Sequence, residues 1–233
     1  MALHKTMRSG IYITGTDTGI GKTFASVALL HALRAHGLSA VGMKPVASGC
    51  ELRDGQWCNE DALALQTASD PRPRYDDANP YALPAATAPE IAAREAAVEI
   101  ELPKIESAYR RLQAQSDVVV VEGVGGWAAP LSSTLDQCDV VRALDLRVVL
   151  VIGLRLGCIS HARLTARAME ADGIALAGWV ANAVDPHMTD RAAYLELLRL
   201  RIAAPCLGRL PHLPPDRRAG TLAGYYALDA LLN

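Results

Sequence analysis

The chain has 233 residues, of which 51% are apolar and 21% charged, and its 23 basic and 25 acidic side chains give a net charge of −2 at pH 7. This composition is typical of a globular protein with a large core, and it excludes collagen-like, disordered and disulfide-scaffold classes. A charge so near zero argues against a general binder of nucleic acids or membrane surfaces, and no run of about 20 apolar residues occurs that could span a bilayer.

Short apolar runs, typical of strands, alternate with longer helical stretches. The strand predictions cover residues 11–14, 40–44, 118–121, 148–153, 179–182 and 206–210. The helix predictions cover residues 23–36, 160–172, 187–202 and 220–231. This alternation predicts an α/β fold in which a doubly wound, mostly parallel sheet lies between two layers of helices, with right-handed connections.

Residues 45–116 interrupt the alternation, and we interpret them as one long crossover within a single domain of residues 1–233. They contain a polar loop, a short helix near residues 61–66 and a proline-rich stretch over residues 71–89. Thr87-Ala88-Pro89-Glu90 has the pattern of a capping box that opens a further helix. Ligands of such sheets bind beyond the carboxyl ends of the strands, so functional residues are expected there.

Gly15-Thr16-Asp17-Thr18-Gly19-Ile20-Gly21-Lys22-Thr23 follows the first predicted strand and precedes the first predicted helix, the context of a nucleotide phosphate loop. Its glycines let backbone N–H groups approach phosphate oxygens, and the helix N-terminus favours negative charge. In this interpretation Lys22 reaches the β- and γ-phosphates and the Thr23 hydroxyl binds Mg²⁺. The strict spacing requires glycine at position 16, where this chain has Thr16.

Glu122 follows four valines of a strand that is expected to be buried on both faces, where such proteins place an acidic metal ligand. The usual residue is Asp, but a longer Glu can still bind the metal directly or through water. Gly123, Gly125 and Gly126 follow, so the backbone there can pass close to a ligand. The alternative is an acid at a strand end that points into solvent.

Cysteines stand at positions 50, 58, 138, 158 and 206, an odd number without a CxxC pair. This pattern argues against a disulfide framework and a structural zinc site. The N-terminus has no long apolar core followed by a small-residue cleavage site, so no secretory signal is predicted. We therefore expect a protein of the reducing cytoplasm.

Several segments together resemble one family, the dethiobiotin synthetases, in family order over nearly the whole chain. They are the phosphate loop with Thr14, Lys44-Pro45-Val46-Ala47-Ser48-Gly49, Asn59-Glu60-Asp61-Ala62-Leu63, Asn79-Pro80-Tyr81, Val121-Glu122-Gly123-Val124-Gly125-Gly126-Trp127, Leu156-Gly157-Cys158-Ile159-Ser160-His161 and Gly178-Trp179-Val180-Ala181-Asn182. The resemblance implies a P-loop NTPase fold and an ATP-dependent ring closure. Diaminopelargonic acid, CO₂ and ATP give dethiobiotin, ADP and phosphate, through a carbamate and a carbamic–phosphoric anhydride.

The resemblance also implies which residues form the site. Lys44 and Lys22 are expected as catalytic cations, and Thr23, Asp61 and Glu122 as Mg²⁺ ligands. The expected ATP contacts are Gly19, Ile20, Gly21, Lys22, Thr23, Asp61, Glu122, Gly123, Gly125, Asn182, Ala183, Pro211, His212 and Leu213. The expected substrate contacts are Thr16, Ser48, Gly157, Cys158 and Ser160. The last three are donated by the neighbouring subunit of a homodimer whose substrate sites lie at the interface.

Some of these residues have a simpler interpretation without the resemblance. Lys44 is then a solvated lysine at a strand end, and Asp61 a favourable charge at the start of a helix that Asn59 caps. Asn182 is then a turn residue.

The chain also departs from the family pattern at three positions. Gly19 stands where some members have Glu, Arg155 replaces a Lys, and Ser160 replaces an Asn of the carboxylate-binding segment. None of these departures removes an expected metal ligand or catalytic lysine.

Two other classes of P-loop protein are the alternatives to a synthetase. A positioning or partitioning ATPase, which works as a nucleotide-switched dimer, carries a signature lysine early in its loop, but Asp17 stands at that place here. A ligase that amidates corrinoid carboxylates normally carries a glutaminase domain, for which this chain has no room. A synthetase is therefore the favoured prediction.

Overall fold

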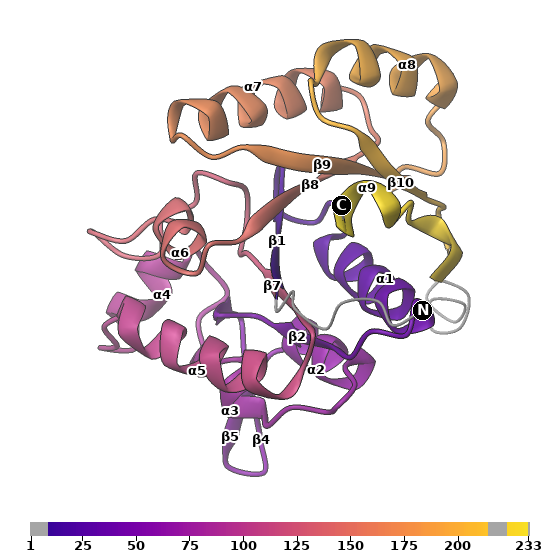
Figure 1. The fold of residues 1–233 in the computed structure, drawn as a ribbon. Coiled ribbons are helices and arrows are strands. Elements are labelled where there is room, and N and C mark those ends of the chain that lie inside the picture. Colours follow the sequence, from indigo (N-terminus) through magenta and orange to yellow (C-terminus); the bar gives the residue numbers. More distant parts are fainter. Residues whose placement is uncertain (1–8, 214–222, 233) are drawn as a thin grey trace.

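Parallel strands form the centre of the fold, which the computed structural model describes for residues 9–213 and 223–232 (Figure 1). The central sheet has six strands in the order β10-β9-β8-β1-β7-β2, and every neighbouring pair is parallel. The strands are β1 (Ser9–Gly15), β2 (Ala40–Met43), β7 (Val118–Glu122), β8 (Arg147–Gly153), β9 (Leu176–Asn182) and β10 (Cys206–Leu210). The predicted α/β fold with a mostly parallel sheet is confirmed.

Helices cover both faces of this sheet. One face carries α1 (Lys22–Ala35), α2 (Glu60–Ala68) and α9 (Asp229–Leu232). The other carries α5 (Leu102–Gln115), α6 (Gln137–Ala143), α7 (Cys158–Ala171) and α8 (Arg191–Arg201). Because successive strand residues point to opposite faces, a strand covered on both sides must be apolar throughout, which explains the buried valines of β7.

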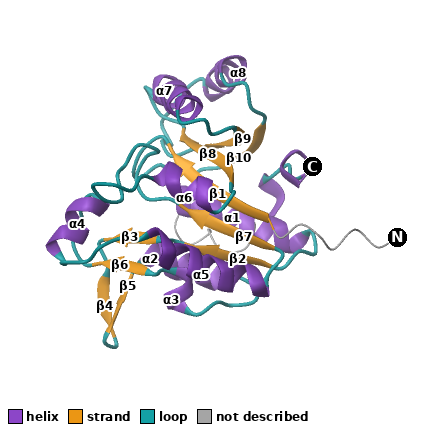
Figure 2. Ribbon diagram, turned by 60° about the vertical axis from the view of Figure 1, so that its left-hand side comes forward, coloured by secondary structure: helices purple, strands orange, loops and turns teal. Residues whose placement is uncertain are grey.

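The crossover of residues 45–116 contains more strands than the sequence predicts. β3 (Val46–Ser48) and β6 (Tyr81–Leu83) form a small parallel sheet, and β4 (Glu51–Arg53) pairs with β5 (Gln56–Cys58) in a hairpin that projects from the body (Figure 2). Helix α2 is joined there by α3 (Tyr75–Ala78) and α4 (Pro89–Glu95). Strands of three residues are too short to show an alternating apolar pattern, which is why the sequence did not reveal them.

The start of α4 differs from the sequence prediction. At α4 the N-cap is Ala88, whose side chain makes no capping hydrogen bond, so the capping box predicted from Thr87 and Glu90 is wrong. Proline at the first helical position starts this helix instead, because its φ angle is already helical. A capping interaction occurs before α6, where the Asp136 N–H donates to the Asp139 carboxylate over 2.9 Å.

The remaining helix predictions are confirmed with shifted ends, whereas α5 and α6 were not predicted. Helix α7 begins at Cys158, earlier than expected, and α8 begins at Arg191, later than expected. The predicted closing helix of residues 220–231 lies partly outside the described residues, and its described part is a 3₁₀ turn (Ala223–Tyr225) followed by α9. None of the described helices combines the length and the apolar character needed to cross a bilayer.

Candidate active site

The loop between β1 and α1 has the backbone of an anion-binding site. Gly19 and Gly21 have φ angles of +74° and +81°, a region that favours glycine, and Gly21 lies directly before α1. The Lys22 Nζ donates to the Asp17 carbonyl oxygen over 2.8 Å. Burial and the charge of Lys44 lower the pKa of Lys22 to about 8. A cation and a helix N-terminus therefore meet at one loop, an arrangement that suits phosphate.

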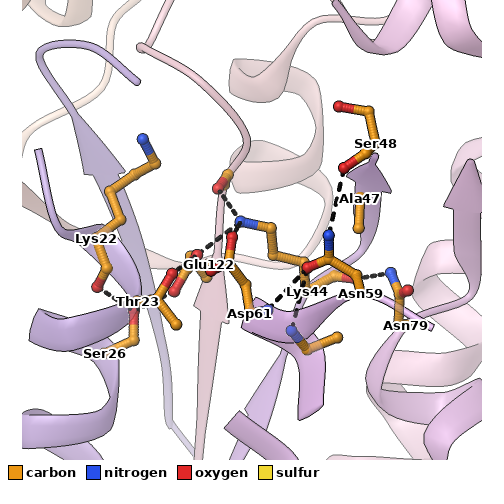
Figure 3. Close-up of polar contacts among 12 residues, drawn as sticks. Lys22, Thr23, Ser26, Lys44, Ala47, Ser48, Asn59, Asp61, Asn79 and Glu122 are labelled. Carbon is orange, nitrogen blue, oxygen red and sulfur yellow. Dashed lines mark hydrogen bonds and ion pairs between the residues drawn. The ribbon is translucent and has the colours of Figure 1, made fainter. Parts of the chain in front are cut away.

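Three adjacent strands bring a second group of charges to this loop. Lys44 follows β2, Glu122 ends β7, and Thr23 lies in the first turn of α1, directly after β1 and the phosphate loop. The Lys44 Nζ lies 2.6 Å from Glu122 Oε1 and 3.2 Å from Asp61 Oδ2, and it donates to the Gly123 carbonyl oxygen over 3.3 Å (Figure 3). Lys44 is 4% exposed, so the alternative of a solvated lysine is wrong.

Both carboxylate oxygens of Glu122 accept hydrogen bonds in the interior. Oε1 accepts from Thr23 Oγ1 over 3.0 Å as well as from Lys44, and Oε2 accepts from Ser26 Oγ over 2.8 Å. Glu122 is fully buried, so the alternative of a solvent-facing acid is wrong. Burial opposes the charge of Lys44, but the charges of Glu122 and Asp61 outweigh it and raise the pKa of the Lys44 ammonium. The Lys44 ammonium therefore stays charged inside the fold.

Asp61 reaches the same group of charges from the first turn of α2. Asn59 caps this helix as predicted, because its Oδ1 accepts from the backbone N–H groups of Asp61 and Ala62 over 3.0 and 3.3 Å. Burial opposes the charge of Asp61, but Lys44 and the Thr23 hydroxyl outweigh it and lower the pKa of the carboxyl. The cap thus fixes a charged carboxylate beside Lys44.

Thr23, Asp61 and Glu122 bring together one hydroxyl and two carboxylates, and hard oxygen ligands of this kind suit Mg²⁺. Within residues 9–213 and 223–232 no three His, Cys, Asp or Glu side chains gather in a way that could hold a metal. A Mg²⁺ ion here needs further ligands, and phosphate oxygens and water are its usual ones. The three side chains therefore fit a phosphate-bound Mg²⁺ better than a structural metal.

Two hollows lie beside the phosphate loop. The larger, of about 780 Å³, is lined by nine of the predicted site residues, namely Gly19, Gly21, Lys22, Thr23, Lys44, Ser48, Asp61, Glu122 and Gly125. We call it the main cavity. A smaller pocket of about 200 Å³ shares two of those glycines and is also lined by Asn182, Ala183, Pro211, His212 and Leu213. We call it the side pocket. The structure thus brings together most of the residues that the sequence analysis assigned to ATP and the metal.

Asn182 links the side pocket to the phosphate loop. Its Nδ2 donates to the Ile20 carbonyl oxygen over 2.9 Å. The side chain therefore holds the phosphate loop, in addition to the turn position that the sequence alone suggests. A Cβ atom on Gly21 would lie 2.1 Å from this nitrogen, which shows why only glycine fits there. On another wall, the His212 Nδ1 lies 3.2 Å from the Ala183 carbonyl oxygen.

The other predicted site residues line neither hollow. Ile20 is 1% exposed and belongs to the core, Gly123 reaches the site only through its carbonyl oxygen, and the Thr16 N–H donates to the Val151 carbonyl oxygen over 3.3 Å. The substrate-binding segment expected from a neighbouring subunit lies at the start of α7 and comprises Gly157, Cys158 and Ser160. Within one chain the structure does not bring this segment into the main cavity.

Two contacts near the site escape the sequence analysis. Ser26 lies one helical turn after Lys22, so helical periodicity combined with the Glu122 prediction could have identified it. Arg155 and Asp17 form an ion pair that joins the loop before α7 to the phosphate loop, and no sequence pattern connects these positions. The Thr18 N–H and Arg155 lower the pKa of Asp17.

Comparisons with known proteins agree with this geometry. A family model described as an AAA domain matches residues 9–217. The ATP-dependent dethiobiotin synthetase BioD of Xylella fastidiosa (strain 9a5c) is 61% identical over 215 residues, which are 92% of this chain and 95% of that protein. Its namesake from Xanthomonas oryzae pv. oryzae (strain PXO99A) is 62% identical over 213 residues, 91% of this chain and 95% of that protein. Among solved structures, the MinC:MinD cell division protein complex of Aquifex aeolicus aligns with a TM-score of 0.55 at 16% identity, over 88% of this chain and 82% of that chain, which shows a shared fold.

Proposed function

Since the chain belongs to the dethiobiotin synthetase family, and is an ATP-dependent ligase that makes dethiobiotin, we propose that the charges around Lys44 form its catalytic centre. The observation that carries this proposal is the contact of the Lys44 ammonium with both Glu122 and Asp61, beside the phosphate loop and within one cavity. The reaction converts diaminopelargonic acid, CO₂ and ATP to dethiobiotin, ADP and phosphate.

ATP is proposed to lie across the phosphate loop, with its phosphates in the main cavity and its base in the side pocket. Backbone N–H groups at Gly19 and Gly21, together with Lys22, face the phosphates. Because Nδ2 of Asn182 already donates to Ile20, its Oδ1 is the atom that accepts a hydrogen bond from the exocyclic amine of adenine. Ala183, Pro211, His212 and Leu213 form the remaining walls of this pocket.

Mg²⁺ is proposed to be held by Thr23, Asp61 and Glu122. When bound, it neutralises charge on the ATP phosphates and polarises their oxygens. In the protein itself, the hydroxyls of Thr23 and Ser26 orient the Glu122 carboxylate, and the Asn59 cap orients Asp61. These contacts hold the oxygen ligands in place before any ligand arrives.

Lys44 and Lys22 are proposed to reduce the repulsion between the reacting anions. One amine of the substrate forms a carbamate with CO₂, and this anion must approach the negatively charged γ-phosphoryl group. Two ammonium groups beside that position stabilise the charge that spreads over the transferred group. Attack of a carbamate oxygen on the γ-phosphorus releases ADP and forms the mixed anhydride. The second amine then attacks the carbonyl carbon of that anhydride, closes the cyclic urea, and releases phosphate and a proton.

Ser48 and Thr16 are proposed to contact the diamine, and Ser48 lines the main cavity together with Lys44. We further propose a homodimer in which Gly157, Cys158 and Ser160 of one subunit bind the substrate carboxylate in its partner. Two observations support this arrangement. The segment lies outside its own main cavity, and the neighbouring Leu156 is 85% exposed.

Release of phosphate by the purified protein tests the proposed function. With Mg·ATP, release should require both diaminopelargonic acid and bicarbonate and should match the cyclic urea that forms. Slow release regardless of the diamine would contradict the synthetase activity while leaving the nucleotide site intact. We also propose a cytoplasmic location, since all five cysteines are free thiols.

A further inference from the structure

Gln137 is a buried amide to which the proposed reaction gives no role, yet its contacts reach the wall of the main cavity. It lies at the start of α6 and is fully buried. Its Nε2 lies within hydrogen-bond distance of four carbonyl oxygens, those of Gly126 at 2.6 Å, Val124 at 3.0 Å, Ala129 at 3.2 Å and Trp127 at 3.3 Å. One side chain therefore holds most of the loop that follows β7.

Tyr12 fixes which end of the Gln137 amide faces this loop. The Tyr12 hydroxyl donates to Gln137 Oε1 over 2.7 Å. Carbonyl oxygens only accept hydrogen bonds, so the NH₂ group with its two hydrogens must face the loop. Burial raises the pKa of Tyr12, which keeps the phenol protonated as a donor. The amide thus has one orientation that satisfies all of its neighbours.

Because the peptide group is planar, the contact of Gln137 with the Val124 carbonyl also fixes the direction of the N–H that follows it. In a trans peptide the N–H points away from the C=O of the same unit. Because the Val124 carbonyl points at Gln137, the N–H of Gly125 points away from Gln137, and Gly125 lines the main cavity. Within the described part of the chain, this N–H makes no hydrogen bond to another backbone group.

The Gln137 amide also packs against Gly123, the residue before the Val124–Gly125 peptide. A Cβ atom on Gly123 would lie 2.4 Å from Gln137 Oε1 and 2.6 Å from the Tyr12 hydroxyl, so glycine lets both side chains approach the backbone. The Gly123 carbonyl oxygen accepts from Lys44 Nζ. Gln137 and Lys44 therefore contact the same short stretch of backbone, each from its own side.

We propose that Gln137 is a positioning residue of the synthetase. It holds the loop of residues 123–129 so that the Gly125 N–H points into the main cavity, where it donates to an anionic oxygen of the ATP phosphates. This inference rests on the proposed function, in which Gly123 and Gly125 contact ATP. The new element is Gln137 as the residue that orients Gly123 and Gly125.

Gln137→Met tests the proposal, because it retains the length of the side chain and removes the donor. We expect kcat about tenfold to a hundredfold lower, while the Kd for ATP changes much less. Deleting an oriented donor outright costs about 10²–10³-fold, and here the Gly125 N–H is misdirected and not removed. The matched control is Gln66→Met. Gln66 is also buried, its Nε2 donates to the Pro73 carbonyl oxygen over 2.9 Å, and it lines neither hollow. Equal kcat losses in both folded variants would overturn the proposal.

The pH dependence of kcat in a Gln137→Glu variant distinguishes a positioning role from a purely structural one. A carboxylate would be repelled by the four carbonyl oxygens, whereas its protonated form can donate one hydrogen bond to the loop. The Tyr12 hydroxyl and the loop carbonyls face this position, and Asp136, Cys138 and Asp139 flank it in the sequence. Glu122 acts on the same Tyr12, and Lys44 contacts the Gly123 against which the amide packs. The ratio of the variant's kcat to the wild-type kcat should rise as the pH falls from about 8.5 to about 6.5. A constant ratio would overturn the positioning role.

The wild-type assay keeps the two proposals distinguishable. A wild-type protein whose phosphate release ignores the diamine contradicts the proposed function before any variant is made. A wild-type synthetase with an equally active, folded Gln137→Met variant contradicts the role of Gln137 alone. If the Met variant does not fold, the pH dependence of Gln137→Glu decides the question.

Discussion

The Lys44 ammonium lies 2.6 Å from Glu122 Oε1, across the ends of the neighbouring strands β2 and β7. Both groups are buried, so the loss of Lys44 removes the ammonium that faces Glu122, whereas the loss of Glu122 leaves Asp61 as the partner of Lys44. The hydroxyls of Thr23 and Ser26 also bond to Glu122, and they remain when Lys44 is removed. The pair therefore serves stability as well as the proposed catalysis, and experiments must separate the two effects.

Replacing Lys44 by alanine should lower turnover by about 10²–10³-fold while ATP still binds, because a cation that stabilises the transferred phosphoryl group is lost. The unpaired Glu122 should also reduce the free energy of unfolding by about 3–5 kcal/mol. Steady-state kinetics, calorimetric ATP binding and urea unfolding measure the three effects. The double variant Lys44→Ala with Glu122→Gln should recover stability without turnover. Normal turnover in the single variant would remove Lys44 from the mechanism.

Replacing Thr23 by valine should raise the Mg²⁺ concentration that gives half-maximal activity, since one proposed ligand hydroxyl disappears at nearly constant volume. Titration of activity with Mg²⁺ at fixed ATP measures this midpoint. Ser26→Ala is the matched control, because it removes a hydroxyl from the other oxygen of the same Glu122 carboxylate. Its midpoint should shift less, and equal shifts in the two variants would argue against Thr23 as a ligand.

Replacing Asn182 by alanine should raise the KM for ATP about tenfold and change kcat little, because contacts to the base act equally in ground and transition states. The variant also loses the bond to the Ile20 carbonyl oxygen, so ADP binding should weaken in parallel. Isothermal titration with ADP checks this second expectation. Unchanged nucleotide affinity would exclude the side pocket as the base site.

Replacing Gly208 by alanine should destabilise the fold by about 1–3 kcal/mol, the usual cost of forcing an extra methyl group into packed structure. Its Cβ atom would lie 2.4 Å from the Tyr225 carbonyl oxygen, and backbone cannot move aside as a flexible side chain can. Gly224→Ala is the control, since nothing lies within 4 Å of its Cβ position. Chemical unfolding of both variants should show a loss only at Gly208.

Replacing Leu156 by glutamate should weaken the proposed homodimer, so that sedimentation shows more monomer and the specific activity falls on dilution. Leu52→Glu is the control, because Leu52 is also exposed, at 60%, but lies on the β4–β5 hairpin. A wild-type protein that sediments as a monomer at all concentrations would contradict the dimer itself.

Part of the candidate site could be predicted from the sequence, because these residues stand in short motifs that are typical of nucleotide-binding proteins. Lys22 and Thr23 end a phosphate loop, and Glu122 follows a fully apolar strand. The contact between Lys44 and Glu122 could not be predicted in the same way. It depends on β7 lying beside β2, and these strands are separated by the long crossover.

Gln137 shows where sequence patterns fail altogether. It stands alone in a polar stretch, and the four carbonyl oxygens that surround its Nε2 meet only because the preceding loop curves back over α6. A glutamine without a motif carries no signal of this kind. The pairing of β3 with β6 was missed for a related reason, since it joins segments that lie far apart in the chain.

The order of the strands also bears on synthesis at the ribosome. β1 and β2 are consecutive in the chain, yet β7 lies between them in the sheet. A nascent chain that stops before Val118 lacks the partner of both strands, and its Lys44 has no Glu122 to contact. Such a chain cannot yet gain stability from binding ATP, because the nucleotide site is incomplete. ATP that binds at the proposed site is therefore expected to protect the finished chain from proteolysis and not the unfinished one.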